Sequence, residues 1–437
     1  MEILIQACQL ILSLSILVLL HELGHFIPAK LFKTRVEKFY LFFDPWFSVF
    51  KKKVGDTEYG LGWLPLGGYV KISGMIDESM DKEQMKKPAE PWEFRAKPAW
   101  QRLIIMAGGV FVNLVLGVLI YSMVLAVWGD SYISNEKLVN GVSCSGFAKS
   151  LGFEDGDRIM SVDGKKIERY SEIQEAMLLN DDPYVVEVLR GGEIKTVNIE
   201  ASLIKKWKDG PKSLFFTPAE KTFVEKVLKN SNAEKAGVKR GDLIVSINEI
   251  ETPYFLNVVE ELKKNKSKKV VLNVIRNSSP YSLVVQVDKD GKIGFLKKNT
   301  LEVSYKKYDL PSSIPAGYNL AVDRLSSYIS QFALIFNSDN ELASELGGFG
   351  AIGSMFPGSW NWLQFWKNTA FLSLMLAFMN LLPIPALDGG HIAFLFYEII
   401  VGKPAPEKFV ENAQVVGMVL LFSLLIFANG NDILRLF

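Results

Sequence analysis

The sequence predicts a multi-pass α-helical membrane protein with four transmembrane helices and a long soluble region of mixed helices and strands. Three observations support this: apolar residues make up 49% of the 437-residue chain, several apolar runs are long enough to cross a bilayer, and a Gly-Asp segment between them occurs twice. The formal net charge of +1 gives no indication of a nucleic-acid surface. Cys8 and Cys144 are the two cysteines, so we expect no disulfide framework.

The first two apolar runs extend from Ile3 to Leu20 and from Leu103 to Trp128. Each is long enough for a transmembrane helix. A cleaved signal peptide is the alternative for the first run. However, the preceding residues carry Glu2 and no basic side chain, and no small-residue cleavage site follows. We therefore expect the first run to be a retained helix.

Two further spans are predicted from Thr369 to Leu387 and from Val415 to Ala428. Pro383 and Pro385 must break the end of the third, because proline removes a backbone donor and clashes with the preceding turn. Basic residues between the first two spans place that segment in the cytoplasm; they are Lys30, Lys33, Arg35, Lys38, Lys51, Lys52, Lys53, Arg95, Lys97 and Arg102. Both termini and the long region between the second and third spans are then extracytoplasmic.

That long region contains an internal repeat. Residues 152–163 match residues 237–248 at an offset of 85, and both copies begin with the pattern G-x-x-x-G-D. A period of this size indicates tandem domains rather than a solenoid. Each copy continues through an alternating strand, a helical stretch and a second strand that ends in Arg190 or Arg276.

This layout resembles the PDZ domain, a family in which an extended peptide adds a strand beside the binding helix. The alternative is that the two copies are β-rich spacers that bind nothing. After them, apolar residues at spacings of three and four predict an amphipathic helix over 314–336, lying against the membrane or the tandem domains.

The strongest chemical signal is His21-Glu22-Leu23-Gly24-His25, an H-E-x-x-H motif that directly continues the first apolar run. On a helix, positions i and i+4 share one face, so both imidazoles can bind one zinc ion. Glu22 then stands beside a zinc-activated water as a candidate general base. Ionisable residues that continue an apolar helix are costly in lipid and indicate function.

Two histidines leave a catalytic zinc site one ligand short. The segment Asn380-Leu-Leu-Pro-Ile-Pro-Ala-Leu-Asp-Gly-Gly-His391 offers two candidates, Asp388 and His391. Asp388 ends a proline-broken span, where irregular backbone at membrane depth is tolerated only inside protein or beside water. The spacing alone leaves both candidates open.

H-E-x-x-H together with N-x-x-P-x-P-x-L-D-G-G resembles the paired signature of the site-2 protease family, and the tandem PDZ-like insertion resembles its bacterial regulator of sigma-E protease branch. The resemblance covers almost the whole chain. It implies zinc ligation by His21, His25 and Asp388, catalysis by Glu22, and a supporting place for His391. It also implies that Asn380 holds the substrate backbone or polarises its carbonyl, although an asparagine here can instead simply bridge helices.

Residues 59–72 predict two strands joined through a turn rich in proline and glycine. The family has a membrane-reentrant β-hairpin at this place. Its open edge, with Tyr69, Val70 and Lys71, is a candidate for binding an unwound substrate segment. A purely structural hairpin is the alternative.

The expected domains are 1–128 with the first two spans, the PDZ-like regions 129–207 and 208–300, an amphipathic region 301–356, and 357–437 with the last two spans. The resemblance implies an enzyme of the bacterial cytoplasmic membrane that uses Zn²⁺ to cleave single-span membrane proteins in the lipid bilayer. The PDZ-like pair would act outside the cell membrane as a substrate size filter. Two alternatives are a membrane-anchored protease for soluble peptides and a non-catalytic scaffold; the intact Glu22 argues against the scaffold.

Overall fold

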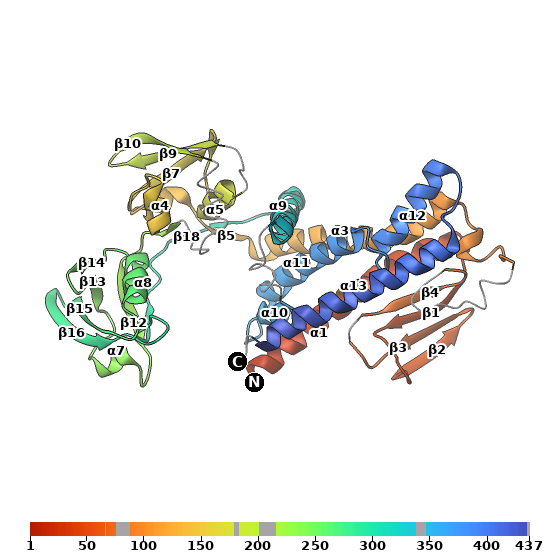
Figure 1. Ribbon diagram of the computed structural model, residues 1–437, viewed down its shortest axis with the longest axis horizontal. Coiled ribbons are helices and arrows are strands. Elements are labelled where there is room, and N and C mark those ends of the chain that lie inside the picture. Colours follow the sequence, from red (N-terminus) through yellow and green to blue (C-terminus); the bar gives the residue numbers. More distant parts are fainter. Residues whose placement is uncertain (66, 76–87, 179–182, 201–215, 338–346, 435–437) are drawn as a thin grey trace. The chain divides into compact units, whose positions relative to one another are not determined.

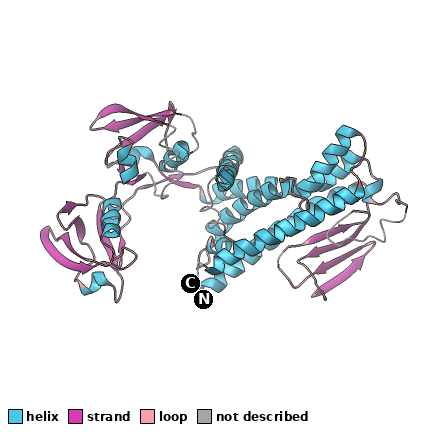
Figure 2. Cartoon of the chain, in the orientation of Figure 1, coloured by secondary structure: helices cyan, strands magenta, loops and turns pink. Residues whose placement is uncertain are grey.

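The computed structural model describes residues 1–65, 67–75, 88–178, 183–200, 216–337 and 347–434. The chain forms two compact units. One consists of Met1–Gly129 together with Lys307–Phe437, and the other of Asp130–Lys306. Long helices dominate the first unit, whereas short strands dominate the second (Figure 2).

The first unit is organised around one central helix, α3. Its helices are α1 (Glu2–Leu31), α3 (Ala99–Trp128), α9 (Leu310–Asn337), α10 (Phe349–Ser354), α11 (Trp362–Leu381), α12 (Asp388–Val401) and α13 (Glu407–Leu434), with a 3-10 turn at Phe94–Ala96 (Figure 1). Helices α1, α9, α11 and α12 all pack against α3. The helix predicted over 314–336 is α9, and it packs on α3 and α11.

Among the described residues, three helices are long and apolar enough to cross a membrane: Glu2–Leu31, Ala99–Trp128 and Lys408–Leu434. They contain the first, second and fourth predicted spans. Helix α1 continues ten residues beyond His21 to Leu31, so the H-E-x-x-H motif lies inside the helix and not at its end. This matters because an unbroken helix fixes the relative position of the two histidines.

Helix α11 contains the start of the third predicted span and is not among these three. Its first half carries Gln364, Lys367 and Asn368, which lower its hydropathy. Asn368 is buried, and its Nδ2 donates to the Met355 carbonyl at 2.7 Å. The helix ends at Leu381, six residues before the predicted end, because Pro383 and Pro385 follow.

A four-stranded sheet follows α1. Its strands are β1 (Val36–Leu41), β2 (Phe50–Val54), β3 (Thr57–Leu61) and β4 (Tyr69–Ile72), in the order β2-β3-β1-β4. The residues that predicted a hairpin do form two strands, β3 and β4. The predicted hairpin is nevertheless wrong, because these strands flank β1 on opposite sides.

Strand β1 takes the central position because it buries more apolar side chains than any other strand of the sheet. Val36 and Tyr40 are almost fully buried. Strand β3 runs parallel to β1 and β4 runs antiparallel to it, while β3 forms its hairpin with β2. Gly62 donates to the Leu41 carbonyl at 2.9 Å where the chain passes the end of β1. The proline and glycine residues indicated the two strands, but they could not show that β1 lies between β3 and β4.

The second unit has two hydrophobic cores, one for each repeat. The first repeat contains β6 (Val142–Cys144), α4 (Gly146–Ser150), β7 (Arg158–Val162), β8 (Lys165–Lys166), α5 (Tyr170–Leu178), β9 (Tyr184–Arg190), β10 (Glu193–Ile199) and β11 (Phe216–Pro218). The second contains β12 (Thr222–Val227), α7 (Asn232–Lys235), β13 (Leu243–Ile247), β14 (Ile250–Glu251), α8 (Phe255–Lys264), β15 (Lys269–Arg276), β16 (Ser279–Gln286) and β17 (Phe295–Lys297). Strands β5 (Asp130–Ile133) and β18 (Val303–Lys306) pair with each other.

The predicted repeat is visible in the hydrogen bonds as well as in the order of elements. Asp157 in the first copy and Asp242 in the second are both fully buried. Each receives two hydrogen bonds from the arginine that ends the long strand, Arg190 or Arg276, at 2.7 to 2.8 Å. The Gly-Asp pattern therefore marks a buried ion pair that ties the turn to the sheet.

The boundary predicted at 207/208 falls outside the described residues. Phe216 nevertheless belongs to the first core, and its strand β11 pairs with β6. The first repeat therefore extends at least to Pro218, later than predicted. The similarity between residues 152–163 and 237–248 indicated two copies, but it gave no sign that β11 pairs with β6 at the other end of the first copy.

Candidate metal centre

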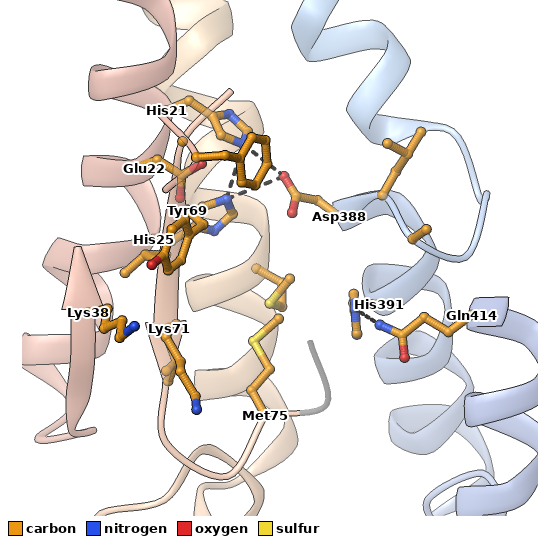
Figure 3. A pocket seen from close by; sticks show the side chains of 17 residues that line it. His21, Glu22, His25, Lys38, Tyr69, Lys71, Met75, Asp388, His391 and Gln414 are labelled. Atoms are coloured by element: carbon orange, nitrogen blue, oxygen red, sulfur yellow. Dashed lines mark hydrogen bonds and ion pairs between the residues drawn. The ribbon is translucent and has the colours of Figure 1, made fainter. Parts of the chain in front are cut away.

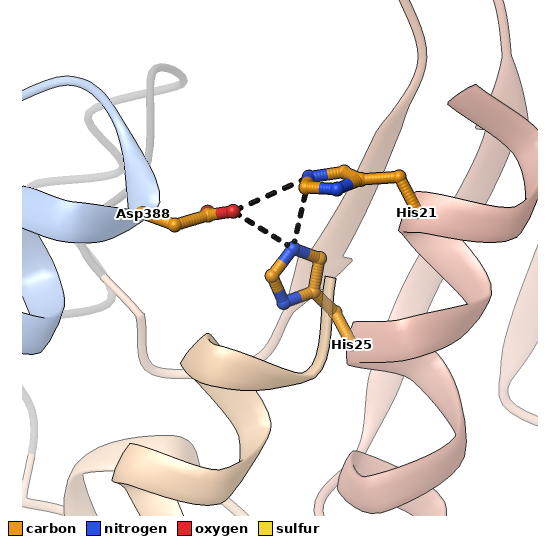
Figure 4. Close-up of side chains that lie close together, drawn as sticks. All are labelled: His21, His25 and Asp388. Atoms are coloured by element: carbon orange, nitrogen blue, oxygen red, sulfur yellow. Dashed lines mark hydrogen bonds and ion pairs between the residues drawn. The ribbon is translucent and has the colours of Figure 1, made fainter. Parts of the chain in front are cut away.

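Three side chains from two distant parts of the chain converge in the first unit (Figure 4). His21 and His25 lie on one face of α1, and Asp388 is the first residue of α12. His21 Nε2 and His25 Nε2 are 3.3 Å apart. Asp388 Oδ2 lies 3.2 Å from the first nitrogen and 3.3 Å from the second.

These distances fit a zinc site. Ligand atoms about 2.0–2.1 Å from a tetrahedral zinc ion lie about 3.3 Å from one another. The three edges of 3.2, 3.3 and 3.3 Å match that value. Asp388 Oδ2 is buried and, within the described part of the chain, accepts no hydrogen bond of good geometry. Two imidazole nitrogens and an unsatisfied carboxylate oxygen form a donor set suited to a divalent metal.

His25 is held by the helix that crosses α1. It is 4% exposed, and its Nδ1 lies 2.8 Å from the carbonyl oxygen of Ile105 on α3. A carbonyl can only accept, so Nδ1 carries the proton and donates it. Nε2 then carries a lone pair that is directed at Asp388 and His21. A metal ion requires this form of the imidazole.

Three glycines allow this close approach of α1 and α3. A Cβ added to Gly24 would lie 2.4 Å from the Gly108 carbonyl oxygen. A Cβ added to Gly109 would lie 2.3 Å from His25 Nε2 and 2.6 Å from His21 Cε1. Analysis of the sequence noted the apolar run that contains Gly108 and Gly109 but gave neither a role. The signal that could have indicated this role is the Gly-Gly pair inside an apolar helix.

A cavity of about 430 Å³ opens beside the three side chains (Figure 3). Glu22 lines it next to the histidines, as predicted from the motif. Tyr69, Val70 and Lys71 of strand β4 also line it. Among the described strands, β4 pairs with β1 and is the last strand on that side of the sheet. The structure thus brings the predicted binding strand and the predicted catalytic carboxylate to one cavity.

The cavity wall has fixed polar groups. The Tyr69 hydroxyl donates to Asp44 Oδ1 at 2.9 Å. Burial and this hydrogen bond raise the pKa of Tyr69, so its side chain is a neutral group. Lys38 and Lys71 also line the cavity, and Lys71 Nζ lies 3.4 Å from Glu37 Oε2.

Asn380 and His391, the other residues predicted for the site, lie at different distances from the three converging side chains. Asn380 Nδ2 on α11 is 3.5 Å from His21 Nε2, which puts this amide at the ligand triangle. His391 lies one helical turn beyond Asp388, and its Nε2 is 3.4 Å from the side-chain amide nitrogen Nε2 of Gln414 on α13. Of the two candidates for a third ligand, Asp388 is the one that joins His21 and His25 among the described residues.

Comparison with known proteins agrees with this geometry. A model of peptidase family M50 matches residues 9–424. The chain belongs to peptidase family M50. A protein of Borreliella burgdorferi named as a zinc metalloprotease is 30% identical, with 97% of each chain aligned. The regulator of sigma-E protease RseP of Escherichia coli is 27% identical, with 98% of each chain aligned.

The predicted family is therefore confirmed: this M50 peptidase is a membrane zinc metalloprotease of the site-2 protease type. The regulator of sigma E protease of Haemophilus influenzae is 26% identical with the same coverage of 98% of each chain. The predicted enzyme class and the predicted zinc cofactor agree with these relatives.

Gly109→Ala tests whether the space between α3 and the imidazoles is needed. We expect the added methyl group to displace both histidines and to lower zinc content and proteolysis by at least 10-fold, since displaced ligands lose metal affinity. Gly430→Ala on α13 is the matched control, because its added Cβ meets no atom within 4 Å. Zinc is measured by mass spectrometry of purified protein. Full zinc content in the Gly109→Ala protein would contradict this role.

Asp388→Ala and His391→Ala distinguish the two candidates for the third ligand. We expect Asp388→Ala to lose most bound zinc, because it removes one of three converging atoms. His391→Ala should keep zinc, since its ring contacts Gln414 instead. Metal analysis at several zinc concentrations gives the order of affinity. The reverse order would show that Asp388 is not the ligand.

Proposed function

We propose that this protein hydrolyses single-span membrane proteins within or near the bilayer, with zinc held by His21, His25 and Asp388. The observation that carries the proposal is that two corners of the triangle, His21 and His25, directly continue a helix whose residues 3–20 contain no charged side chain. A protease for soluble peptides has no need of ligands that continue such a helix. A non-catalytic scaffold has no need of an intact triangle with Glu22 beside it.

The depth of the site supports cleavage near one membrane surface. At a rise of 1.5 Å per residue, His21 lies about 28 Å along α1 from Glu2. The hydrocarbon core of a bilayer is about 30 Å thick. If Glu2 marks one surface, the site lies near the other, where basic residues from Lys30 onward follow. Water then reaches the reaction without crossing the membrane.

Each residue of the site has a proposed task. When bound, zinc supplies the Lewis acidity that makes water a nucleophile near neutral pH. Glu22 takes the proton of the attacking water and passes it to the leaving amine. Asn380, with its amide nitrogen 3.5 Å from His21 Nε2, donates to the substrate carbonyl oxygen.

Strand β4, which lies at one side of the described sheet, is the proposed binding strand. Tyr69, Val70 and Lys71 present their backbone on the wall of the cavity that contains Glu22. A peptide added to this edge gains main-chain hydrogen bonds only in the extended form. We therefore expect the substrate helix to unwind before cleavage, since a helix keeps its carbonyls paired internally.

The repeats of the second unit are proposed to be two PDZ domains that screen substrates by size. Their matching cores and matching Asp-Arg pairs support a duplicated domain. The proposed topology has four spans, with α11 as the third, in the bacterial cytoplasmic membrane. Both termini and the second unit are then extracytoplasmic, in agreement with the basic segment between α1 and α3.

Glu22→Gln tests the mechanism. We expect the variant to bind zinc as the parent does and to cleave a purified single-span substrate about 10²–10⁴-fold more slowly, because an amide cannot accept the water proton. Glu2→Gln, the same change at the start of α1, is the control and should leave the rate unchanged. Equal cleavage by the Glu22→Gln and parent enzymes would exclude Glu22 as the base.

Substrate helix stability tests the proposed substrate class. Glycine and proline destabilise a helix by about 1 and 3 kcal/mol relative to alanine. Placing either near the scissile bond of one single-span substrate should raise the initial rate, and a leucine-rich replacement should lower it. Rates are compared at saturating substrate in one detergent. If all versions are cleaved equally, unwinding is not part of the reaction.

A further inference from the structure

Asn113 is a buried polar residue of α3 to which the proposed mechanism gives no task. It is 1% exposed, and its Nδ2 lies 3.2 Å from Nδ1 of His21. Its Oδ1 is also buried and has no hydrogen-bond partner within the described ranges of the chain. A buried amide that touches a metal ligand and leaves its oxygen unpaired requires an explanation.

A contact between Asn113 Nδ2 and His21 Nδ1 conflicts with metal binding by His21. Nε2 of this ring faces Asp388 and His25, so it must offer a lone pair if it binds zinc. The proton of the neutral ring is then on Nδ1. A protonated Nδ1 opposite an amide NH₂ puts two donors face to face. The NH₂ group cannot accept, so the contact would be repulsive.

Reversing the amide removes this conflict. The oxygen and nitrogen of an asparagine amide have nearly the same shape, so the hydrogen-bond partners decide their assignment. With Oδ1 facing His21, the unpaired oxygen gains a donor and Nδ1 gains an acceptor. This arrangement also makes His21 equivalent to His25, whose Nδ1 donates to the Ile105 carbonyl.

We propose that Asn113 is a positioning residue for the metal site: its Oδ1 accepts the Nδ1 proton of His21 and so directs the Nε2 lone pair at the metal. The proposal rests on the proposed zinc ligation by His21. An acceptor on the far nitrogen of a metal-bound histidine fixes both its tautomer and its ring orientation.

The surroundings of Asn113 suit this task. Ser373 on α11 donates to the backbone carbonyl of Asn113 at 2.7 Å, and both groups are buried. This bond fixes the turn of α3 that carries the amide. Ile105, Gly109 and Asn113 are spaced four residues apart, so they lie on one face of α3. That face supplies both acceptors, the Ile105 carbonyl for His25 and the Asn113 amide for His21, and Gly109 lies between them.

Two substitutions separate an accepting role from a donating one. Asn113→Leu keeps the approximate size and removes the acceptor, so we expect zinc to bind about 10–100-fold more weakly. Asn113→Asp keeps the acceptor and cannot donate, so its zinc affinity should equal or exceed that of the parent. Ser122→Ala is the matched control: it removes a side-chain hydrogen bond to the Val118 carbonyl on the same helix, away from His21, and should leave the zinc affinity unchanged.

Affinity is measured on full-length protein by competition with a zinc chelator, after thermal unfolding has shown that each variant is folded. A direct readout needs no variant. The chain has three histidines, so ¹⁵N-histidine labelling of zinc-loaded protein with a non-histidine tag gives three resolvable rings. We expect His21 to carry its proton on Nδ1, with a proton signal that shifts in Asn113→Asp.

The outcomes are distinct. Equal zinc loss in Asn113→Asp and Asn113→Leu, unchanged affinity in Asn113→Leu, or a His21 proton on Nε2 would each overturn the proposal. Retention of zinc by Asp388→Ala would instead overturn the proposed ligand set on which it rests. A normal Asn113→Leu protein together with a zinc-free Asp388→Ala protein would leave the ligand set intact and remove only the role of Asn113.

Discussion

The contact between the backbones of α1 and α3 is the constraint on which the metal centre depends. A Cβ on Gly108 would lie 2.0 Å from the Gly24 carbonyl oxygen, and a Cβ on Gly24 would lie 2.4 Å from that of Gly108. Small residues at such crossings let transmembrane helices approach closely enough for backbone contact. Gly24 is one of the two unspecified positions of the H-E-x-x-H motif, so the motif carries the helix contact together with the ligands.

The position of Asp388, the proposed third ligand, depends on a second set of close backbone contacts. A Cβ on Gly389 would lie 2.1 Å from the Leu382 carbonyl oxygen, and one on Gly390 would lie 2.7 Å from that of Ile384. The chain therefore folds back on itself between the prolines and the start of α12. Gly417 lets α13 pass against Pro385, where a Cβ would lie 1.5 Å from the carbonyl oxygen. This tight packing holds Asp388 at the N-terminus of α12, where the helix dipole favours a carboxylate.

The sequence predicted those parts of the site that depend on spacing within one element. His21 and His25 follow from helical periodicity, and the break after α11 follows from Pro383. The resemblance to site-2 proteases supplied Asp388, which periodicity alone could not choose over His391. The pairing of β3 and β4 was wrong because strand order depends on which strand buries the most apolar surface, and here β1 does. Asn113 lies inside the second predicted span, but its neighbour on another helix cannot be found from any local pattern.

The position of the site at a membrane-spanning helix, as proposed, explains why α3 has to contribute so much to it. In water, the outer nitrogen of each ligand histidine would be satisfied by solvent, whereas in lipid every polar group needs a partner from the protein. The Ile105 carbonyl meets the outer nitrogen of His25 and still belongs to an uninterrupted helix, because a carbonyl oxygen has two lone pairs. In a helix, the side chain four residues later lies over that carbonyl, and at this position the residue is Gly109. Any larger residue at this position would cover the second lone pair of the Ile105 carbonyl and push both imidazoles away. Because Gly109 has no side chain, this face of α3 can pack directly against the two imidazoles.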